Sequence, residues 1–488
     1  MLLTLLRLLY FACVALLMLY ALGAGALLIA YFLRRPDKPT PSPERSTVRA
    51  GADSPSAGLP SVCVQLPVFN EPFVIDRLID AAARLDYPPD RLTIQVLDDS
   101  QDDTTERAAE RVATWAARGI HIEHVRRVDR SGFKAGALAH GAAISDAEFF
   151  AVFDADFVPP PDFLRRIVPF FEADPTVGMV QTRWGHLNAD DNTLTRAVAL
   201  ALDGHFVVEQ AARSSAGWLM NFNGSGGVWR AEAIRQAGGW CADTLTEDLD
   251  LSYRAQLAGW RLTYLPDLVV PGEIPPRLSL YRQQQARWAQ GGTQVFTQMV
   301  GAIWTHSDLT FIQRLMATAH LAQYLVHVLI ILLIILTPLL IVFKALPSFS
   351  FGPLGLVSLF PVLIYAASQR ALHPDWRGRL ARGFPALAVI ATGMAWCNAR
   401  SALLGIVKSG GEFRRTPKFG SAAVTAIATP VFSVELLLCL YSAFGLWLAL
   451  RWAPGLTAYF VVYTLSFGIM TIWLWRDNVY SRRWRSRV

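Results

Sequence analysis

Acidic residues follow an apolar segment of this 488-residue chain in a spacing that suits a divalent metal ion. Asp154 and Asp156 stand one residue apart directly after Val152-Phe153. At the end of a strand, two such carboxylates supply one direct ligand and one ligand through water to Mg²⁺ or Mn²⁺, and positions stay open for phosphate oxygens. An ion held this way neutralises charge on a departing diphosphate. The spacing predicts Asp154 and Asp156 as metal ligands, with Asp154 also contacting the nucleotide; a solvated loop pair is the alternative.

Two more segments carry groups that fit a nucleotide. Asp98 and Asp99 follow Val96-Leu97, where carboxylates can accept hydrogen bonds from a base or ribose; a cap for the following helix is the alternative. Lys134 lies among small residues at 132–136, where the backbone can approach a ligand and the ammonium offers a point charge to phosphate; a loop entering a helix is the alternative. We expect Asp98, Asp99 and Lys134 to bind the nucleotide.

A third acidic motif, Thr246-Glu247-Asp248, precedes a stretch with helical periodicity. Group transfer with inversion needs a base that takes the proton from the attacking hydroxyl. We predict Asp248 as this base and Glu247 as the second catalytic carboxylate; an acidic helix start that only complements the helix dipole is the alternative. Asn223 and Gly224 open a glycine-rich segment that would let the chain run close to an acceptor, or would form a plain turn.

A cationic and aromatic motif lies on a predicted amphipathic helix at 279–299. Gln284, Arg287 and Trp288 fall within one turn of that helix. Arg287 can bind a leaving diphosphate, and Trp288 offers a flat face on which a sugar ring can stack. We expect Arg287 to bind the donor and Trp288 the acceptor; an interfacial anchor for the helix is the alternative.

These residues depend on an α/β domain for their positions. Apolar or β-branched runs alternate with helical patterns from residue 61 onward. The expected strands are 62–66, 93–97, 120–125 and 149–153, and the expected helices are 71–85, 104–118 and 133–144. Such alternation predicts a mostly parallel sheet with helices on both faces, in which ligands bind beyond the carboxyl ends of the strands. The aspartates should therefore converge on one crevice.

Hydropathy adds a membrane part. Residues 8–33 are almost free of charge and long enough to cross a bilayer, and we interpret them as a retained anchor rather than a cleaved signal peptide. Apolar runs return at 316–343, 351–367, 384–395, 430–450 and 456–475. Lys and Arg gather after the first span, after the third and at the C-terminus, so five crossings with a cytosolic α/β domain fit the charges and six do not. Residues 384–408 then form a shallow or re-entrant interfacial helix.

Charge and cysteine content exclude two other classes. The formal net charge is +6, but the positive residues sit mostly beside the spans, where anionic lipid headgroups rather than nucleic acid explain them. The five cysteines are dispersed and show neither zinc-ligand spacing nor a disulfide framework.

The motifs together resemble the membrane-embedded processive glycosyltransferases of family 2, the cellulose synthase group, and especially the cellulose-synthase-like mannan and glucan backbone synthases. The likeness runs over residues 61–418 and is carried by Gln95 to Ser100, Gly132 to Leu138, Phe222-Asn223-Gly224 and Ala237 to Trp240. It implies a GT-A-type, Rossmann-like glycosyltransferase domain with a mixed sheet, beside a transmembrane helical bundle with interfacial helices. It implies the site roles given above and adds Gln284 as a contact to the donor diphosphate.

The resemblance also gives meaning to a segment at 413–418. It is similar to the Phe-x-Val-Thr-x-Lys gating loop of cellulose synthases, so Thr416 and Lys418 are implied as donor contacts. Arg415 stands where that motif has Val. An ordinary basic loop at a membrane surface is the alternative.

The resulting expectation is an inverting transferase that moves a hexose from UDP-glucose or GDP-mannose to a growing β-linked, 1,4-linked polysaccharide and passes the product through the bundle. The expected partners are the nucleotide sugar, a glycan acceptor, membrane lipids and export proteins, in a bacterial inner membrane with the catalytic domain cytosolic. A non-processive enzyme that glycosylates a lipid is the nearest competitor, and a transporter or scaffold is a distant one. The sugar, the linkage and the chain length are not encoded by these motifs.

The expected organisation assigns eight consecutive parts to the chain. These are an anchor at 1–33, a linker at 34–60, the GT-A domain at 61–275, interfacial helices at 276–312, a transmembrane hairpin at 313–370, an interfacial helix and gating-type loop at 371–429, a second hairpin at 430–476 and a basic tail at 477–488.

Overall fold

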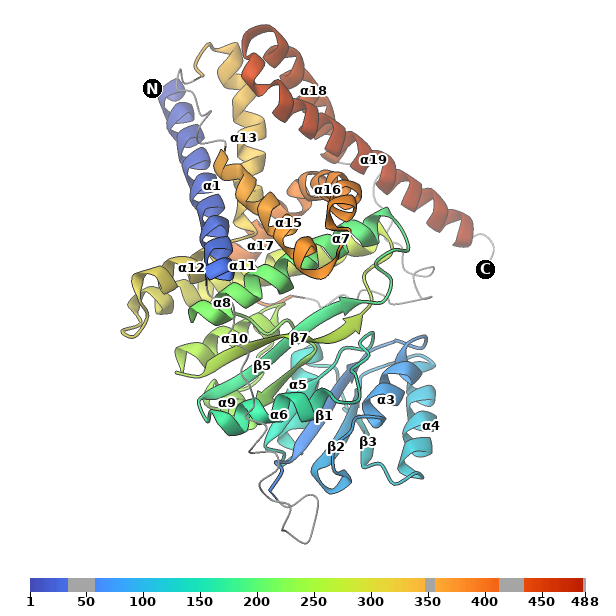
Figure 1. The fold of residues 1–488 in the computed structure, drawn as a ribbon. Helices are drawn as coiled ribbons and strands as arrows, with labels where there is room; N and C mark the ends of the chain where they lie inside the picture. The colour runs from blue at the N-terminus through green and yellow to red at the C-terminus, as the bar shows by residue number, and fades with distance from the viewer. Residues whose placement is uncertain (34–57, 347–355, 412–433, 486–488) are drawn as a thin grey trace.

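The computed structural model places a sheet domain beneath a group of long helices (Figure 1). The structure describes residues 1–33, 58–346, 356–411 and 434–485. The expected gating-type segment with Thr416 and Lys418 lies outside these ranges, as does most of the expected linker. Helix α1 runs from the top of the bundle down to the sheet domain, so its carboxyl end meets the domain while the N-terminus lies far from it.

Within the described residues, seven strands form one mixed sheet in the order β3-β2-β1-β4-β6-β5-β7. The strands are β1 (Val62–Val68), β2 (Leu92–Asp98), β3 (Ile122–Arg126), β4 (Phe149–Val152), β5 (Val177–His186), β6 (Gly227–Arg230) and β7 (Arg261–Gly272). Only β6 runs against its neighbours β4 and β5; the other pairs are parallel. The expected strands match β1 to β4 within two residues at each end.

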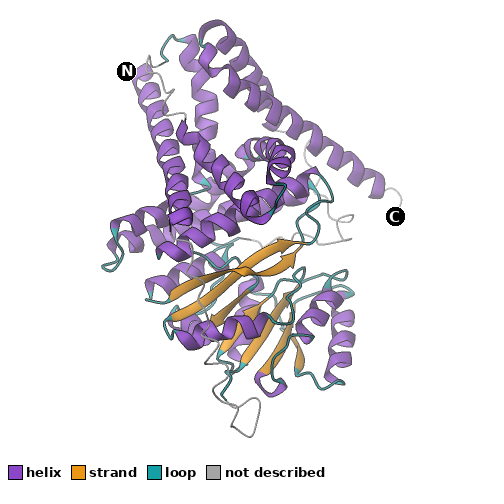
Figure 2. Cartoon of the chain, in the orientation of Figure 1, coloured by secondary structure: helices purple, strands orange, loops and turns teal. Residues whose placement is uncertain are grey.

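Helices cover both faces of this sheet (Figure 2). They are α3 (Ile75–Ala83), α4 (Thr104–Ala116), α5 (Phe133–Ala143), α6 (Phe163–Ala173), α7 (Thr193–Asp203), α8 (Ala211–Ala216), α9 (Ala231–Gln236) and α10 (Glu247–Leu257), with a π-helical segment η2 (Gly204–Gln210) between α7 and α8. Alternate residues of β1 enter two separate cores: Val62, Val64 and Leu66 pack with α3 and α6, and Cys63 packs with α5. Because both faces are buried, the strands carry apolar residues on both sides, which explains the near-continuous apolar runs.

One helix start was predicted wrongly. The helix expected from residue 71 begins as α3 at Ile75. Asn70 has a positive φ of 53° and Pro72 follows it, and the backbone N–H groups of Val74 and Ile75 both bond to the carbonyl of Glu71 in a tight turn. The turn directs the chain from the end of β1 around the crevice before the helix begins.

The helical part contains nine further helices among the described residues. They are α1 (Leu2–Leu33), α11 (Leu278–Thr305), α12 (Phe311–Leu321), α13 (Leu325–Val342), α15 (Phe360–Leu372), α16 (Trp376–Gly393), α17 (Ala395–Val407), α18 (Val434–Trp452) and α19 (Thr457–Arg485). Four segments are long and apolar enough to cross a membrane: α1, α13, α18 and 454–477. The apolar run at 316–343 is not one helix, because the chain breaks between α12 and α13 at residues 322–324.

Two segments bear on the expected number of crossings. Residues 356–372, at about 1.5 Å per residue, fall short of a hydrocarbon core of about 30 Å within the described range. Helices α16 and α17 are apolar enough only as a pair and bend by 48° at their junction, as a broken span or a re-entrant loop would. The count of five crossings therefore stays a prediction.

Candidate active site

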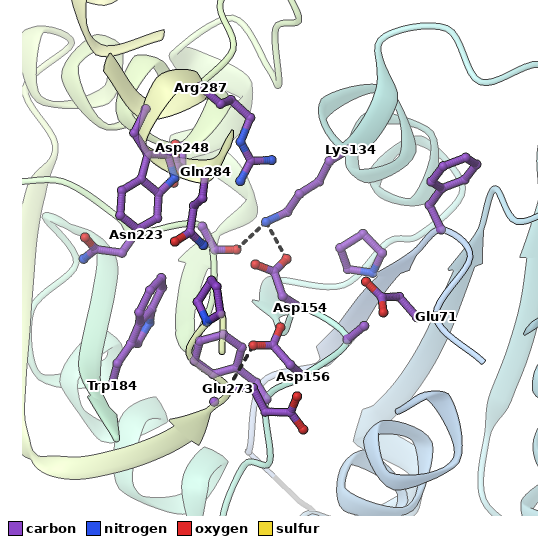
Figure 3. A pocket seen from close by; sticks show the side chains of 18 of the residues that line it. Glu71, Lys134, Asp154, Asp156, Trp184, Asn223, Asp248, Glu273, Gln284 and Arg287 are labelled. Carbon is purple, nitrogen blue, oxygen red and sulfur yellow. Dashed lines mark hydrogen bonds and ion pairs between the residues drawn. The ribbon is translucent and has the colours of Figure 1, made fainter. Parts of the chain in front are cut away.

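A cavity of about 1300 Å³ opens at the carboxyl ends of β1, β2 and β4, beneath α10 and α11 (Figure 3). Most of the residues predicted from the sequence line this cavity. They are Asp99, Lys134, Asp154, Asp156, Asn223, Gly224, Glu247, Asp248, Gln284, Arg287 and Trp288. The motifs therefore converge although up to 189 positions separate Asp99 from Trp288 in the sequence.

Lys134 lies at the centre of this group and points from α5 toward Asp154 (Figure 3). Its Nζ is 2.6 Å from Oδ1 of Asp154 and 3.6 Å from Oε1 of Glu247, and it donates a hydrogen bond of 2.8 Å to the carbonyl of Gly224. Burial lowers the pKa of Lys134, but the Asp154 and Glu247 carboxylates outweigh burial and raise it above its ordinary value. The ammonium therefore stays charged and joins three of the predicted motifs.

Asp248 and Glu247 occupy the first turn of α10. Burial and the neighbouring Glu247 carboxylate together raise the pKa of Asp248 to about 7, against the lowering effect of Lys134 and Arg287. The backbone N–H of Leu249 donates to Oδ1 of Asp248 at 2.8 Å, which leaves Oδ2 toward Gly224. A carboxyl group that titrates near neutral pH is matched to the work of a general base.

The backbone at Asn223-Gly224 approaches the Asp248 side chain closely. Gly224 has a φ of 82°, and a Cβ there would lie 2.8 Å from Oδ2 of Asp248 and 3.2 Å from Nζ of Lys134. Only glycine fits such a position without strain. The Asn223 side chain is fixed from behind, because its Oδ1 accepts hydrogen bonds from Nδ2 of Asn221 and lies 2.9 Å from Nε2 of His205 on η2.

The strand-end acids Asp154 and Asp156 are held by the segments around them. The backbone N–H of Asp154 donates to Oγ of Ser225 at 3.0 Å, and Oδ2 of Asp156 accepts from the backbone N–H of Glu273 at 3.0 Å. The described residues contain no group of three or more His, Cys, Asp or Glu side chains able to hold a metal ion. Two oxygen ligands from protein fit Mg²⁺ or Mn²⁺ when phosphate and water supply the rest.

Asp98 and Asp99 point in different directions, as neighbours at a strand end do. Asp99 lines the cavity and pairs with Arg127, whose Nε and Nη2 lie 3.0 and 2.5 Å from its two oxygens. Asp98 does not line the cavity: its side chain is fully buried, bonds to the backbone N–H of Ser100 and lies 3.0 Å from Nε2 of His124. These contacts lower the pKa of Asp98 to about 2 although burial opposes them. The structure thus gives Asp98 a role in fixing the loop after β2.

Helix α11 closes the cavity with Gln284, Arg287 and Trp288. The guanidinium of Arg287 is buried, which lowers its pKa, while the Glu247 and Asp154 carboxylates favour its charged form. Gly291 on the same helix packs against Thr246, and a Cβ at Gly291 would lie within 2.9 Å of three Thr246 atoms. This close packing holds the Thr246-Glu247-Asp248 segment against helix α11, which carries Arg287.

Sequence reasoning missed Glu273 in the cavity and Gln294 beside it. Gln294 on α11 is fully buried; its Oε1 accepts from the backbone N–H of Leu245 at 2.9 Å, and its Nε2 donates to the carbonyls of Lys408 and Gly410 at 2.9 and 2.7 Å. Glu273 follows β7, lines the cavity and pairs with Arg77 at 2.7 Å. An acid after an apolar strand was a usable signal for Glu273, whereas nothing local marked Gln294.

Comparison with known proteins identifies the class. Residues 60–291 match the family model described as glycosyltransferase like family 2. Glucomannan 4-beta-mannosyltransferase 2 of Arabidopsis thaliana is 42% identical over 294 residues, which cover 59% of this chain and 54% of that protein. Glucomannan 4-beta-mannosyltransferase 9 of the same plant is 36% identical over 368 residues, which cover 72% of this chain and 67% of that protein.

The chain therefore belongs to glycosyltransferase family 2, in the cellulose-synthase-like group, and the expected GT-A-like fold with a mixed sheet is confirmed. Its matches span about half to two thirds of the length of these curated relatives. Among solved structures, the mannosyltransferase PcManGT from Pyrobaculum calidifontis in complex with GDP-Man and Mn²⁺ is similar at a TM-score of 0.48 and 22% identity, covering 82% of this chain and 99% of that one.

Proposed function

We propose that this chain is an inverting hexosyltransferase that moves mannose from a nucleotide sugar to the end of a β-1,4-linked glycan. The observation that carries the proposal is a single cavity that holds a strand-end acid pair suited to a metal ion and a carboxyl group, Asp248, with a pKa of about 7. The relatives are named for 4-beta-mannosyl transfer in glucomannan, which supports GDP-mannose over UDP-glucose as the donor.

The donor would lie across the strand ends. Asp154 and Asp156 would hold Mg²⁺ or Mn²⁺, which neutralises charge on the diphosphate when it is bound. Lys134 and Arg287 are buried cations of the same cavity and would pair with the phosphate oxygens. Asp99, fixed by its two contacts to Arg127, would face the nucleoside.

The transfer step would use Asp248 in its deprotonated form. Asp248 takes the proton from the 4-hydroxyl of the terminal acceptor sugar as that oxygen attacks C1 of the donor sugar. The C1–diphosphate bond breaks on the opposite face, so an α-linked donor gives a β-linked product, and the diphosphate leaves with its electron pair. Lys134 and Arg287 stabilise the charge that develops on the leaving oxygen.

The acceptor would enter between Trp288 and the Asn223-Gly224 backbone. Trp288 lines the cavity on the side of the helical bundle and offers an aromatic face to a sugar ring. We propose that the glycan, once extended, then moves from the cavity into the helical bundle. Polar side-chain contacts inside the bundle would line its route. These contacts are Tyr324 to Gln285 at 3.3 Å, Asn398 to His327 at 3.1 Å and Arg282 to Glu435 at 2.7 Å. Polar groups of this kind inside a membrane bundle are expensive and typically mark a substrate path.

We also propose that the catalytic domain faces the cytosol. The support is the bias of Lys and Arg toward the loops on the domain side, together with four helices long and apolar enough to cross a membrane among the described residues. The curated relatives are plant proteins, so they give no support to the expected bacterial inner membrane.

The test is donor turnover by the purified chain in detergent or nanodiscs with Mn²⁺ present. GDP-mannose, UDP-glucose and a blank are compared, and the labelled product is split into chloroform-soluble and insoluble fractions. We expect turnover of GDP-mannose and an insoluble product that an endo-β-1,4-mannanase degrades. A chloroform-soluble product with one sugar would replace the proposal with transfer to a lipid. Absence of turnover with both donors would refute the proposed hexosyltransferase activity.

A further inference from the structure

A second cavity lies between the sheet domain and the helical bundle. It holds about 1150 Å³ and is bounded by the end of β5, by α7, by the end of α15 and by α16. In Figure 1, α7, α15 and α16 cross at the border between the sheet and the long helices. Gly185 and His186 line this cavity on one side and the candidate active site on the other.

Arginines from three separate elements meet in this cavity. Arg183 comes from β5, Arg196 from α7, and Arg379 and Arg382 come from α16. The lining also contains Asp190 and Asp203, so four cations face two anions among the described lining residues and the formal charge is +2. Like charges gathered at one place repel each other, and the repulsion is relieved when an anion binds between them.

The carboxylates nearby do not use up this positive charge. Oδ1 of Asp203 lies 3.1 Å from Nε2 of His186, and Oδ2 accepts from Nε2 of Gln369 at 2.7 Å, so Asp203 is engaged by the wall. Within the described ranges, Asp190 pairs with one arginine, with 4.0 Å between its Oδ1 and Nε of Arg196.

The two arginines of α16 that line the cavity share one exposed acidic partner among the described residues. Arg379 and Arg382 lie 3.3 and 3.6 Å from the two oxygens of Asp375, and the side chains of all three are more than a third exposed. Burial and the neighbouring Arg379 guanidinium lower the pKa of His373, which lines the same cavity. Both observations indicate a positive potential that one carboxylate does not cancel.

We propose that this cavity binds the phosphate group of an anionic lipid headgroup. Its position at the foot of the bundle favours a lipid over a soluble anion, because Leu372 contributes to the lining and Leu359 and Leu363 are exposed on the preceding turns. A headgroup phosphate in the cavity leaves the acyl chains beside this apolar surface. Guanidinium groups bind phosphate through paired hydrogen bonds, and anionic lipids gather where basic groups flank apolar helices.

The experiment measures lipid retention by the purified full-length chain in native mass spectrometry. Phosphatidylglycerol and phosphatidylcholine with the same acyl chains are added at equal concentration to the parent protein and to Arg379→Gln/Arg382→Gln. We expect the parent protein to retain more phosphatidylglycerol than phosphatidylcholine. The double variant should retain about tenfold less phosphatidylglycerol than the parent. The matched control is Arg377→Gln, on the same helix but outside the cavity lining, which should retain the lipid like the parent.

Several outcomes would overturn the proposal. Equal loss in Arg377→Gln would mean that surface charge in general attracts the lipid, and equal retention of phosphatidylcholine would mean that no anion site exists. Displacement of phosphatidylglycerol by inorganic phosphate at millimolar concentration would assign the site to a soluble anion. If the double glutamine variant fails to fold, Arg196→Gln on α7 replaces it and should lower phosphatidylglycerol retention; unchanged retention would reject the site.

Discussion

Two cavities share the carboxyl end of β5 but carry charge of opposite sign. On the active-site side, seven described carboxyl side chains face three cationic ones, whereas on the far side four arginines face two aspartates. Gly185 and His186 line both cavities, and helix α7 contributes residues to each. The acidic cavity is suited to cations and to a base, and in the proposed function Lys134, Arg287 and a metal ion would offset the charge of an anionic diphosphate. The basic cavity attracts an anion by itself. The difference allows the end of one strand to border two sites of opposite charge, one for the proposed sugar transfer and one for the proposed lipid headgroup.

The largest expected effect comes from removing the base of the acidic cavity. In Asp248→Asn the amide keeps the shape of the side chain but cannot take a proton, so transfer should fall about 10³-fold. Donor binding should persist, because Lys134, Asp154 and Asp156 are unchanged. Initial rates with labelled GDP-mannose and calorimetric titration of the donor measure the two properties. A variant with near-parental rates would exclude Asp248 as the base.

A smaller effect should follow from crowding the same cavity. In Gly224→Ala the added methyl group meets Oδ2 of Asp248 and Nζ of Lys134 and strains a backbone with a positive φ, so the rate should fall on the order of 10²-fold. Gly217 also has a positive φ, of 67°, but nothing lies within 4 Å of a Cβ there. Gly217→Ala is therefore the matched control for backbone strain alone. Equal losses in both variants would show that crowding of the base is not the cause.

The protonation of Asp248 should set a pH dependence for the acidic cavity. A base works only when it is deprotonated, and the pKa of Asp248 is raised to about 7. Activity should thus be full above about pH 8 and fall about tenfold per pH unit below 7. Values of kcat/KM measured between pH 5.5 and 9 test this direction of the pH dependence. A kcat/KM that rises toward acid pH would contradict it. Retention of phosphatidylglycerol by the arginine cavity should not follow the same curve.

Gln294 connects the acidic motif to the end of α17, and its loss should have a moderate effect. In Gln294→Glu the donor to the Lys408 and Gly410 carbonyls is lost, while an oxygen remains for the backbone N–H of Leu245. We expect kcat to fall about 30-fold or more, because two hydrogen bonds of about 1 kcal/mol each are lost and the new carboxyl group faces two carbonyl oxygens. Gln298→Glu, at an exposed position one turn further along α11, is the control and should be silent. Hydrogen exchange at Leu245 gives a readout that does not depend on activity.

The smallest expected effect is that of the arginine cavity on the chemistry. Arg379→Gln/Arg382→Gln should leave the KM for GDP-mannose within about twofold of the parent in detergent, because neither side chain lines the active-site cavity. A large rise in KM would mean that the basic cavity holds the donor diphosphate. The proposed roles of the two cavities, donor binding in one and lipid binding in the other, would then be wrong.

The sequence by itself determined part of the sheet domain, most of the apolar segments and most of the active-site residues. Alternating apolar runs and helical periods are local properties, so β1 to β4, α4, α5 and the four long apolar segments could be predicted from them. Asp154, Asp156, Lys134 and Asp248 could be predicted because parallel strands and the helices after them bring such ends to one edge of a sheet.

The tertiary structure decided what depends on distant neighbours. It turned Asp99 and not Asp98 into the cavity, and it buried Asp248 under α11 beside Glu247, which sets the pKa near 7. It also placed Gln294 between two loops and gathered Arg183, Arg196, Arg379 and Arg382 from elements up to 199 positions apart. Desolvation and charge density arise from packing in three dimensions, and no spacing along the chain encodes them.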